Sequence, residues 1–502
     1  MALCGAVIGA AVSNSALDAR LRVIVQLLAG AIVLALVVPL ILGRWRVLLG
    51  SLFAWLVVED LLRKLAGNDL RLYFVKDVIY LLVLIGLATD PGVRSTWTRA
   101  TGRTRWALYA LIGWGLALSV ASFFENPVLP AVGMRLHFLY VPLVVAGFLM
   151  ARDSARVRRW LVGLATLAAA ASIVGIIQAV VGPDFLSPGQ PTDLQHLELT
   201  RRTLSGRELF QPSGPFADPG RLIAASVVGV TVAFAAFVGW RKQARGPILL
   251  GIVCAAGTWA ASGKAGVILV GTLALATIVS LRFGSRERRV RWAMGTATVL
   301  IVALVALAAA FPGLFRDRVE YFAQTLSPTS PVNEWSDRFD AWESDIARGI
   351  AIGGLLGTGT GQESLGRQYI FGDETDERRL SQVEGGYASL AVEWGLIGIG
   401  LWLVWSISWT RRLWRSGKRL RGSSLASATF VLFAWAVMVL FVRFMTGLSS
   451  WQDYLPNAYF WFLSGVVFGL ASWSGTQADA QMARAEPSAR IGTAYHPDPV
   501  VR

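Results

Sequence analysis

The sequence predicts an all-α fold, a polytopic transmembrane helical bundle of about 12–14 spans, with a large external loop late in the chain that contains an amphipathic helix. Hydrophobic residues make up 54% of the chain, and its mean hydropathy is +0.54. Apolar runs of roughly 20 residues, the length that crosses a bilayer, recur along the sequence. These runs are continuous rather than alternating, which excludes a transmembrane β-barrel.

The formal net charge of +15 raises the question of nucleic-acid binding. The arginines and lysines lie mostly in short linkers between apolar runs, which is the pattern of cytoplasmic loops in membrane proteins. We therefore expect a lipid bilayer as partner and no nucleic acid. Cys4 and Cys254 lie far apart in apolar segments, so both are interpreted as packing residues. The first residues lack the basic region of a cleaved signal peptide.

Twelve apolar segments are predicted to cross the membrane. They are residues 24–42, 74–88, 107–121, 129–150, 160–181, 217–240, 247–261, 265–283, 292–311, 387–409, 424–447 and 456–474. Residues 46–60 form a shorter span. Residues 3–17 are marginal, because they fit either a short span or an interfacial helix.

Every second linker is basic, and such linkers face the cytoplasm. The loops predicted to lie outside are residues 61–73, 122–128, 182–216, 312–386 and 448–455. The chain then divides into four parts. They are transmembrane helices over 1–311, the large external loop over 312–386, C-terminal transmembrane helices over 387–474 and a disordered cytoplasmic tail over 475–502.

The large external loop is predicted to form a helix from about Asn333 to Ile350. Its apolar residues recur at spacings of three and four, as on one face of a helix: Trp335, Phe339, Trp342, Ile346 and Ile350. These aromatic residues suit packing on the membrane or on the bundle. Arg338 projects from the same side, where it would bind either an anionic head group or a neighbouring carboxylate.

A glycine-rich stretch follows this helix, with Gly357, Gly359 and Gly361 at alternate positions. Alternating glycines let successive backbone N–H groups converge on an anion. A tight turn that returns the chain to the membrane is the favoured interpretation, since no Walker motif follows.

Glu384 and Tyr387 lie at the mouth of the next predicted span. A carboxylate there suits a general base toward a sugar hydroxyl, or equally a solvated residue at a helix N-terminus. Glu393 lies deeper in the span and is interpreted as a structural acid that bonds between helices.

Several cations stand near the external ends of the spans, where positive charge is otherwise scarce: Arg135, Arg221, Lys264 and Arg443. If they converge, they would form a pocket for a phosphate or pyrophosphate group. Snorkelling to the interface is the alternative for each one. The acidic run from Asp373 to Glu377 is interpreted as a solvated face, and the three histidines form no metal set.

These residues together resemble the O-antigen ligase and polysaccharide polymerase family of bacterial envelope proteins. The resemblance rests on Arg338 and Trp342, the glycines 357–361, and Tyr387 followed by Glu393-Trp-Gly-Leu-Ile-Gly398. Two earlier stretches are also similar, Ser213–Pro219 and Ser262–Ala265. The order of these motifs, spread over about 200–400, carries the resemblance more than any one of them does.

The resemblance implies an enzyme of the bacterial cytoplasmic membrane, a metal-independent glycosyltransferase with no cofactor. Such proteins transfer a glycan from an undecaprenyl-pyrophosphate-linked oligosaccharide to a glycan or lipid acceptor on the external face. Pyrophosphate is a good leaving group, so cations that stabilise it and a positioned hydroxyl are what the reaction needs. Other polysaccharide-assembly proteins are expected among its partners.

The sequence departs from the family at one important place. His-Asn often stands at the mouth of the late span in this family, and here the residues are Glu384 and Gly385. Near the first external element, Arg207 and Arg221 are both possible substitutes for an expected arginine. The sequence leaves polymerase and ligase open, and a transporter or flippase of lipid-linked oligosaccharide is the alternative from another class.

Overall fold

The computed structural model describes residues 44–491 with several gaps. The gaps are residues 66–69, 91–92, 183–184, 187–199, 203–207, 241–244, 262–264, 284–297, 299–300, 303–304, 307, 327–333, 365–366, 368–382 and 448. The predicted segments 3–17 and 24–42, and most of 292–311, lie outside the described residues. The side chains beyond Trp473 also lie outside them.

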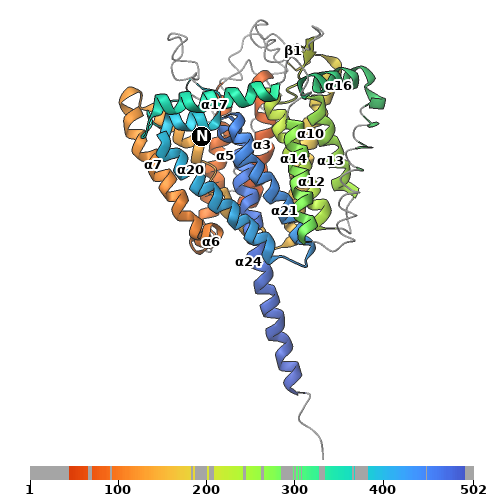
Figure 1. Cartoon of the computed structure of the whole chain (residues 1–502). Helices are drawn as coiled ribbons and strands as arrows, with labels where there is room; N and C mark the ends of the chain where they lie inside the picture. Colours follow the sequence, from red (N-terminus) through yellow and green to blue (C-terminus); the bar gives the residue numbers. More distant parts are fainter. Residues whose placement is uncertain are drawn as a thin grey trace, which may run out of the picture.

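The described residues are almost entirely helical (Figure 1). In chain order the elements are α3 (Trp45–Leu65), α4 (Leu70–Tyr73), α5 (Val75–Ala88), α6 (Val93–Thr101), η1 (Gly102–Thr104), α7 (Arg105–Glu125), α8 (Val128–Phe138), α9 (Leu143–Met150), α10 (Ser154–Val181), β1 (Thr200–Arg202), β2 (Glu208–Phe210), α12 (Pro219–Gly239), α13 (Arg245–Ala260), α14 (Ala265–Phe283), α16 (Pro312–Leu326), α17 (Glu334–Gly353), α20 (Gly386–Arg419), α21 (Ser424–Val437), η3 (Met438–Arg443), α22 (Phe444–Thr446), α23 (Ser449–Gln452) and α24 (Tyr454–Ile491). The strands β1 and β2 pair antiparallel, with Thr200 opposite Phe210.

Seven described helical segments are long and apolar enough to cross a membrane, so the predicted all-α polytopic bundle is confirmed. They are Ser95–Glu125, Val128–Met150, Ser154–Val181, Pro219–Gly239, Gly386–Arg419, Ser424–Arg443 and Tyr454–Trp473. The other predicted spans that fall on described residues are also helices, namely α3, α5, α13 and α14. Helix α3 continues to Leu65, beyond the predicted end at residue 60.

The centre of the bundle is built around α24, whose span Tyr454–Trp473 is 94% buried within the protein. Helix α9 lies against it closely, because glycines stand where the two backbones meet. A Cβ on Gly147 of α9 would clash with the carbonyl of Phe462, and one on Gly465 would clash with the carbonyl of Val144. Small residues serve the same purpose at helix interfaces in membranes generally, where packing replaces the hydrophobic effect as the driving force.

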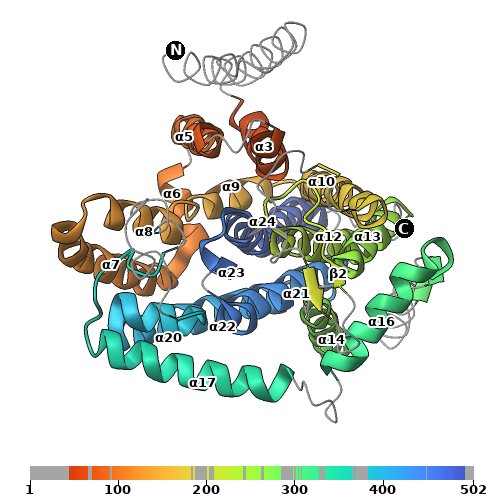
Figure 2. The same cartoon turned by 90° about the horizontal axis from the view of Figure 1, so that it is seen from above.

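Helix α17 crosses one end of the bundle and runs beside α20 (Figures 1 and 2). Its last turn packs directly on the α20 backbone, since a Cβ on Gly349 would meet the carbonyl of Ala388 and one on Gly353 that of Ala391. Ile346 packs against Val383, Ala388 and Val392. The helix predicted from the apolar stripe thus lies on the bundle top. We call this end the α17 end, and the opposite one, where α6 lies, the α6 end.

The glycine-rich stretch fills a break in α20. Gly395 has φ 65° and ψ −169°, a conformation that interrupts the helix. The N–H groups of Leu396 and Ile397 donate instead to the carbonyls of Gly354 and Leu355, at 3.1 and 3.3 Å. The freed backbone groups are therefore satisfied inside the protein, as an interruption at membrane depth requires.

Candidate functional site

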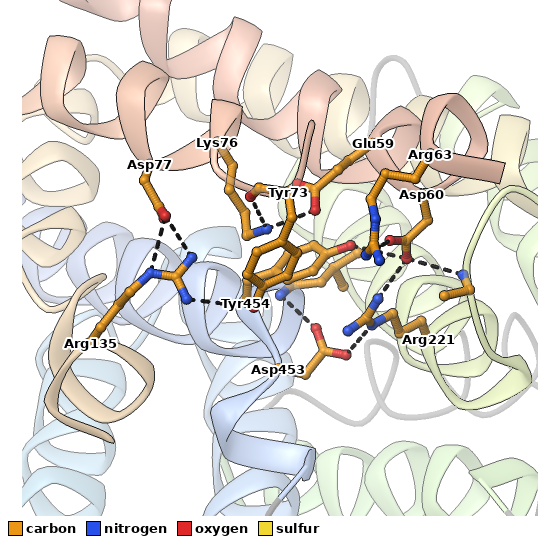
Figure 3. A network of polar contacts seen from close by, with 12 residues as sticks. Glu59, Asp60, Arg63, Tyr73, Lys76, Asp77, Arg135, Arg221, Asp453 and Tyr454 are labelled. Carbon is orange, nitrogen blue, oxygen red and sulfur yellow. Dashed lines mark hydrogen bonds and ion pairs between the residues drawn. The ribbon is translucent and has the colours of Figure 1, made fainter. Parts of the chain in front are cut away.

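A network of charged side chains, drawn in Figure 3, lies where α3 ends and α24 begins, at the α17 end of the bundle seen in Figure 1. It joins helices that are far apart in the sequence, with four carboxylates, four cations and two tyrosines among its labelled members. We call these residues the polar network: Glu59, Asp60, Arg63, Tyr73, Lys76, Asp77, Arg135, Arg221, Asp453 and Tyr454. Charges placed within a helical bundle are costly, and they are functional-site candidates by default.

One part of the polar network is an ion pair between α3 and α5. The Nζ of Lys76 lies 2.7 Å from Oε1 of Glu59, and both side chains are almost fully buried. Nζ also donates to the carbonyl of Tyr73 at 2.6 Å and lies over the rings of Tyr73 and Tyr454. Oε2 of Glu59 is buried without a hydrogen-bond partner among the described residues. One acceptor therefore stays unused in the interior, which costs free energy.

Arg221 stands at the centre of a second part. Asp218 is the N-cap of α12 and accepts from the Arg221 N–H at 3.1 Å, and Pro219 follows it at the first helical position. This start places Arg221 on the first turn. Its Nη1 lies 2.7 Å from Asp60 Oδ2 and its Nε 2.7 Å from Asp453 Oδ2. The Tyr454 ring covers the guanidinium at 4.8 Å from the ring centroid.

Arg135 forms the third part, on the last turn of α8. Its Nε and Nη2 donate to Oδ2 of Asp77 at 3.0 and 2.6 Å. The rings of Tyr73 and Phe74 lie over its guanidinium. Charge-assisted hydrogen bonds and aromatic contacts of this kind fix the orientation of a guanidinium.

The predicted cations Arg135, Arg221 and Arg443 all lie at this end, each beside at least one acidic residue. Arg443 ends the π-helical segment η3 and interacts electrostatically with Asp453 and Asp218. Tyr387 lies on the first turn of α20, where its ring packs against Phe444 at 4.9 Å between centroids. Phe444 is the residue that follows Arg443 in the sequence.

Other predicted residues lie elsewhere or outside the described residues. Glu384 has an exposed side chain, and its N–H donates to Asp345 of α17 at 2.8 Å. Trp342 is half-buried on α17. The backbone of α17 is described at Trp335 and Arg338, but their side chains are not. Lys264 and Arg207 lie outside the described residues.

A second buried cluster lies beside the polar network. Glu393 of α20 accepts from the backbone N–H of Glu363 at 3.0 Å, and its other carboxylate oxygen is 3.1 Å from Nε2 of His137. Nε2 of His137 is also 3.0 Å from the amide nitrogen of Gln452, while Nδ1 is buried with no hydrogen-bond partner among the described residues. Glu393 thus bonds between elements, in agreement with its predicted structural role.

The glycine-rich stretch does not present its N–H groups to an anion. The N–H groups of Thr358 and Gly359 donate to the carbonyls of Val392 and Glu393, at 2.8 and 3.1 Å. Thr360 is buried, and its hydroxyl donates to the carbonyl of Gly115 at 2.6 Å. The favoured interpretation of this stretch as a turn agrees with these contacts.

Sequence reasoning missed the acids that hold the cations, as well as one buried arginine near β2. The sequence signal for Glu59 and Asp60 is two adjacent acids inside an apolar run, Leu56-Val-Val-Glu-Asp-Leu-Leu62. Arg318 of α16 is buried and donates to the carbonyl of Phe210. Burial lowers the pKa of the Arg318 guanidinium to about 10.

The comparisons with known proteins place few limits on the function. No known family model matches the chain, and no curated protein matches it. One solved structure, described as "Structural coordination of polymerization and crosslinking by a peptidoglycan synthase complex", is similar over 74% of this chain and 96% of that one. The identity is 16% and the TM-score is 0.35, so this similarity carries no argument about the function.

Proposed function

We propose that this multi-pass membrane protein is a glycosyltransferase that polymerises or transfers undecaprenyl-pyrophosphate-linked glycan units. The observation that carries the proposal is that Arg135, Arg221 and Arg443, from three separate helices, all lie at one end of the bundle. Guanidinium groups match the oxygens of phosphate and pyrophosphate in geometry and charge. By the rule that basic linkers face the cytoplasm, the α17 end is the external face of a bacterial cytoplasmic membrane.

The acids of the polar network orient these cations and leave donor atoms free. Arg221 uses Nε and Nη1 on Asp453 and Asp60, and no bond of its Nη2 occurs among the described residues. Arg135 uses Nε and Nη2 on Asp77, and its Nη1 has only a 3.5 Å contact with the Tyr73 hydroxyl. Arg221 and Arg135 therefore each keep an N–H group with which to bind a pyrophosphate oxygen.

The proposed reaction uses these groups as follows. The bond between the anomeric carbon and the carrier's phosphate oxygen breaks, and the carrier pyrophosphate leaves with the electron pair. The acceptor hydroxyl oxygen forms the new bond to carbon and loses its proton to a base. Preorganised cations stabilise the charge on the leaving group. Glu384 is the candidate base, because its exposed carboxylate stands at the external mouth of α20.

The remaining predicted residues take supporting roles in this proposal. Arg338 would contribute to catalysis from α17, and Lys264 and Arg207 would bind pyrophosphate. Trp335 and Trp342 would stack on sugar or lipid, and Tyr387 would line the same region. The acceptor is a second lipid-linked glycan in a polymerase and another lipid in a ligase.

The distribution of charge favours transfer over transport. A flippase of lipid-linked oligosaccharide needs a polar path through the bundle. Within the seven candidate spans, charged residues gather toward the two ends. In α20, for example, no charged residue stands between Glu393 and Arg411, and in α12 none follows Arg221.

The test is incubation of the purified protein, in vesicles, with an undecaprenyl-pyrophosphate-linked oligosaccharide. Products that are multiples of the unit, with released carrier, would establish a polymerase. Release that requires a second lipid acceptor would establish a ligase. Movement of the lipid across the vesicle without transfer would overturn the proposal in favour of the flippase.

Arg338→Ala provides a variant for the same assay. Product should be lost while the protein stays in the membrane, because Arg338 is proposed to act on the substrate. Arg348→Ala is the matched control, since Arg348 is an exposed arginine on the same helix. Equal activity in the two variants would remove Arg338 from the proposed site.

A further inference from the structure

A cavity of about 550 Å³ lies at the α6 end, far from the polar network. Helix α6 and η1 form one wall, the C-terminal half of α20 forms a second, and Phe468 and Ser472 of α24 complete it. Six arginines line it: Arg99, Arg103, Arg411, Arg412, Arg415 and Arg419. A cavity of this volume can hold a small molecule or the head group of a lipid.

The positive charge of this cavity is not compensated. No Asp or Glu lines it, and none of the six arginines forms an ion pair with a described residue. The polar network is different, because carboxylates hold Arg135 and Arg221 there. Like charges that converge in a concave site repel one another, and they raise the local concentration of anions. The rule that basic linkers face the cytoplasm accounts for the side of the membrane on which these arginines lie. It does not require the arginines to enclose a cavity.

Arg412 is held in position within the cavity, with one donor left unused. Its side chain is half-buried, and its Nη2 donates to the carbonyl of Arg99 at 2.5 Å. Its guanidinium lies over the Phe468 ring, 4.1 Å from the centroid. Gly102 has φ +56°, and a Cβ there would lie 3.0 Å from the guanidinium carbon, so glycine makes room for it. Nη1 is buried and has no hydrogen-bond partner among the described residues.

We propose that this cavity binds a phosphorylated ligand that carries two or more negative charges. The exposed arginines around the rim contact the phosphate oxygens, and the Arg412 guanidinium, held in the wall of the cavity, adds its positive charge. Arginine suits this ligand because its planar fork pairs with two phosphate oxygens. The same chemistry is offered by a diphosphate lipid of the adjacent leaflet and by a soluble polyphosphate. The site is separate from the proposed glycan transfer, which takes place at the α17 end.

The experiment measures binding to the purified, delipidated full chain by native mass spectrometry. One arm uses cardiolipin, and the other uses inorganic pyrophosphate. Arg412→Gln should weaken binding of the active probe by roughly tenfold or more, because a positive charge fixed in the cavity wall is lost. Arg415→Gln is a second variant. The Arg415 side chain is exposed, so its replacement should leave the fold intact, and binding should weaken here too.

Arg159→Gln is the matched control, since it removes one exposed positive charge near the start of α10, outside the cavity. Retained binding in this control, with loss in the cavity variants, supports the site. If cardiolipin binds and pyrophosphate does not, the ligand is a diphosphate lipid. If pyrophosphate binds, the ligand is a soluble polyphosphate. Equal loss in all three variants would show mere surface attraction and overturn the proposal, as would no binding of either probe.

Discussion

The guanidinium of Arg221 lies 2.7 Å from the carboxylate of Asp453, although 232 positions separate the two residues in the sequence. Asp60 of α3 binds the same guanidinium from another side, and the Tyr454 hydroxyl donates to Asp60 at 3.2 Å. Three parts of the chain are thus tied together through one side chain at the α17 end. Because Nε and Nη1 are both bonded, the guanidinium is held in one orientation. The direction in which Nη2 points is therefore fixed as well.

Arg221→Lys should reduce glycan transfer by at least roughly tenfold, even though the charge is kept. An ammonium group is a compact charge on a flexible stem and lacks the planar fork that spans the two carboxylates and fixes the third nitrogen, and one charge-assisted hydrogen bond contributes about 1.5–3 kcal/mol. The measurement is the transfer rate of purified protein in vesicles at several substrate concentrations. Arg156→Lys is the control, because Arg156 forms only a partly exposed 3.9 Å pair with Asp153. A transfer rate unchanged by Arg221→Lys would contradict the proposed role.

The buried pair of Lys76 and Glu59 should behave as a unit. Glu59→Gln leaves the Lys76 ammonium without its partner, and we expect this to lower the free energy of unfolding by about 3–5 kcal/mol. The double variant Glu59→Gln, Lys76→Met should lose less than Glu59→Gln alone, because no uncompensated charge then remains. The measurement is thermal unfolding in detergent, in which size-exclusion chromatography determines the fraction of protein that is still folded at each temperature. If the losses of the two single variants simply add in the double variant, the pair does not interact as the 2.7 Å distance indicates.

The fold was largely predictable because a bilayer imposes simple rules on sequence. The apolar runs that fall on described residues are helices, and the spacing of Trp342, Ile346 and Ile350 predicted α17 within a few residues of its observed bounds. The break at Gly395 was not predictable in the same way. It depends on carbonyls of Gly354 and Leu355, which become neighbours only once α17 has packed on α20.

The candidate site was predictable only in part. A cation near the external end of a span is rare enough to be noticed, and this pointed to Arg135, Arg221 and Arg443. Their acidic partners were missed, because Asp77 and Asp453 stand near helix ends, where an acid resembles a solvated residue. Which acid meets which arginine is decided by packing between segments that are far apart in the sequence.

Gly395→Ala should destabilise the protein, by about 1–3 kcal/mol for the backbone strain alone. An alanine cannot easily adopt φ 65° with ψ −169°, and its Cβ would clash with the carbonyl of Leu355. The measurement is the midpoint of thermal unfolding. Gly400→Ala is the control on the same helix, because a Cβ there meets nothing within 4 Å. It should be neutral or stabilising by about 0.5–1 kcal/mol, since alanine favours the helix.

Glu384→Gln tests the proposed base without the complication of unfolding. The Glu384 side chain is exposed, and the bond that anchors this segment is made by its backbone N–H to Asp345, so the variant should fold normally. If the carboxylate removes the acceptor's proton, transfer should fall by roughly 10²–10⁴-fold while binding of the lipid-linked substrate is retained. Glu343→Gln, an exposed acid on α17, is the matched control and should leave the rate unchanged. A variant of Glu384 with full activity would show that the reaction proceeds without this base, with the departing pyrophosphate and a positioned hydroxyl supplying the driving force.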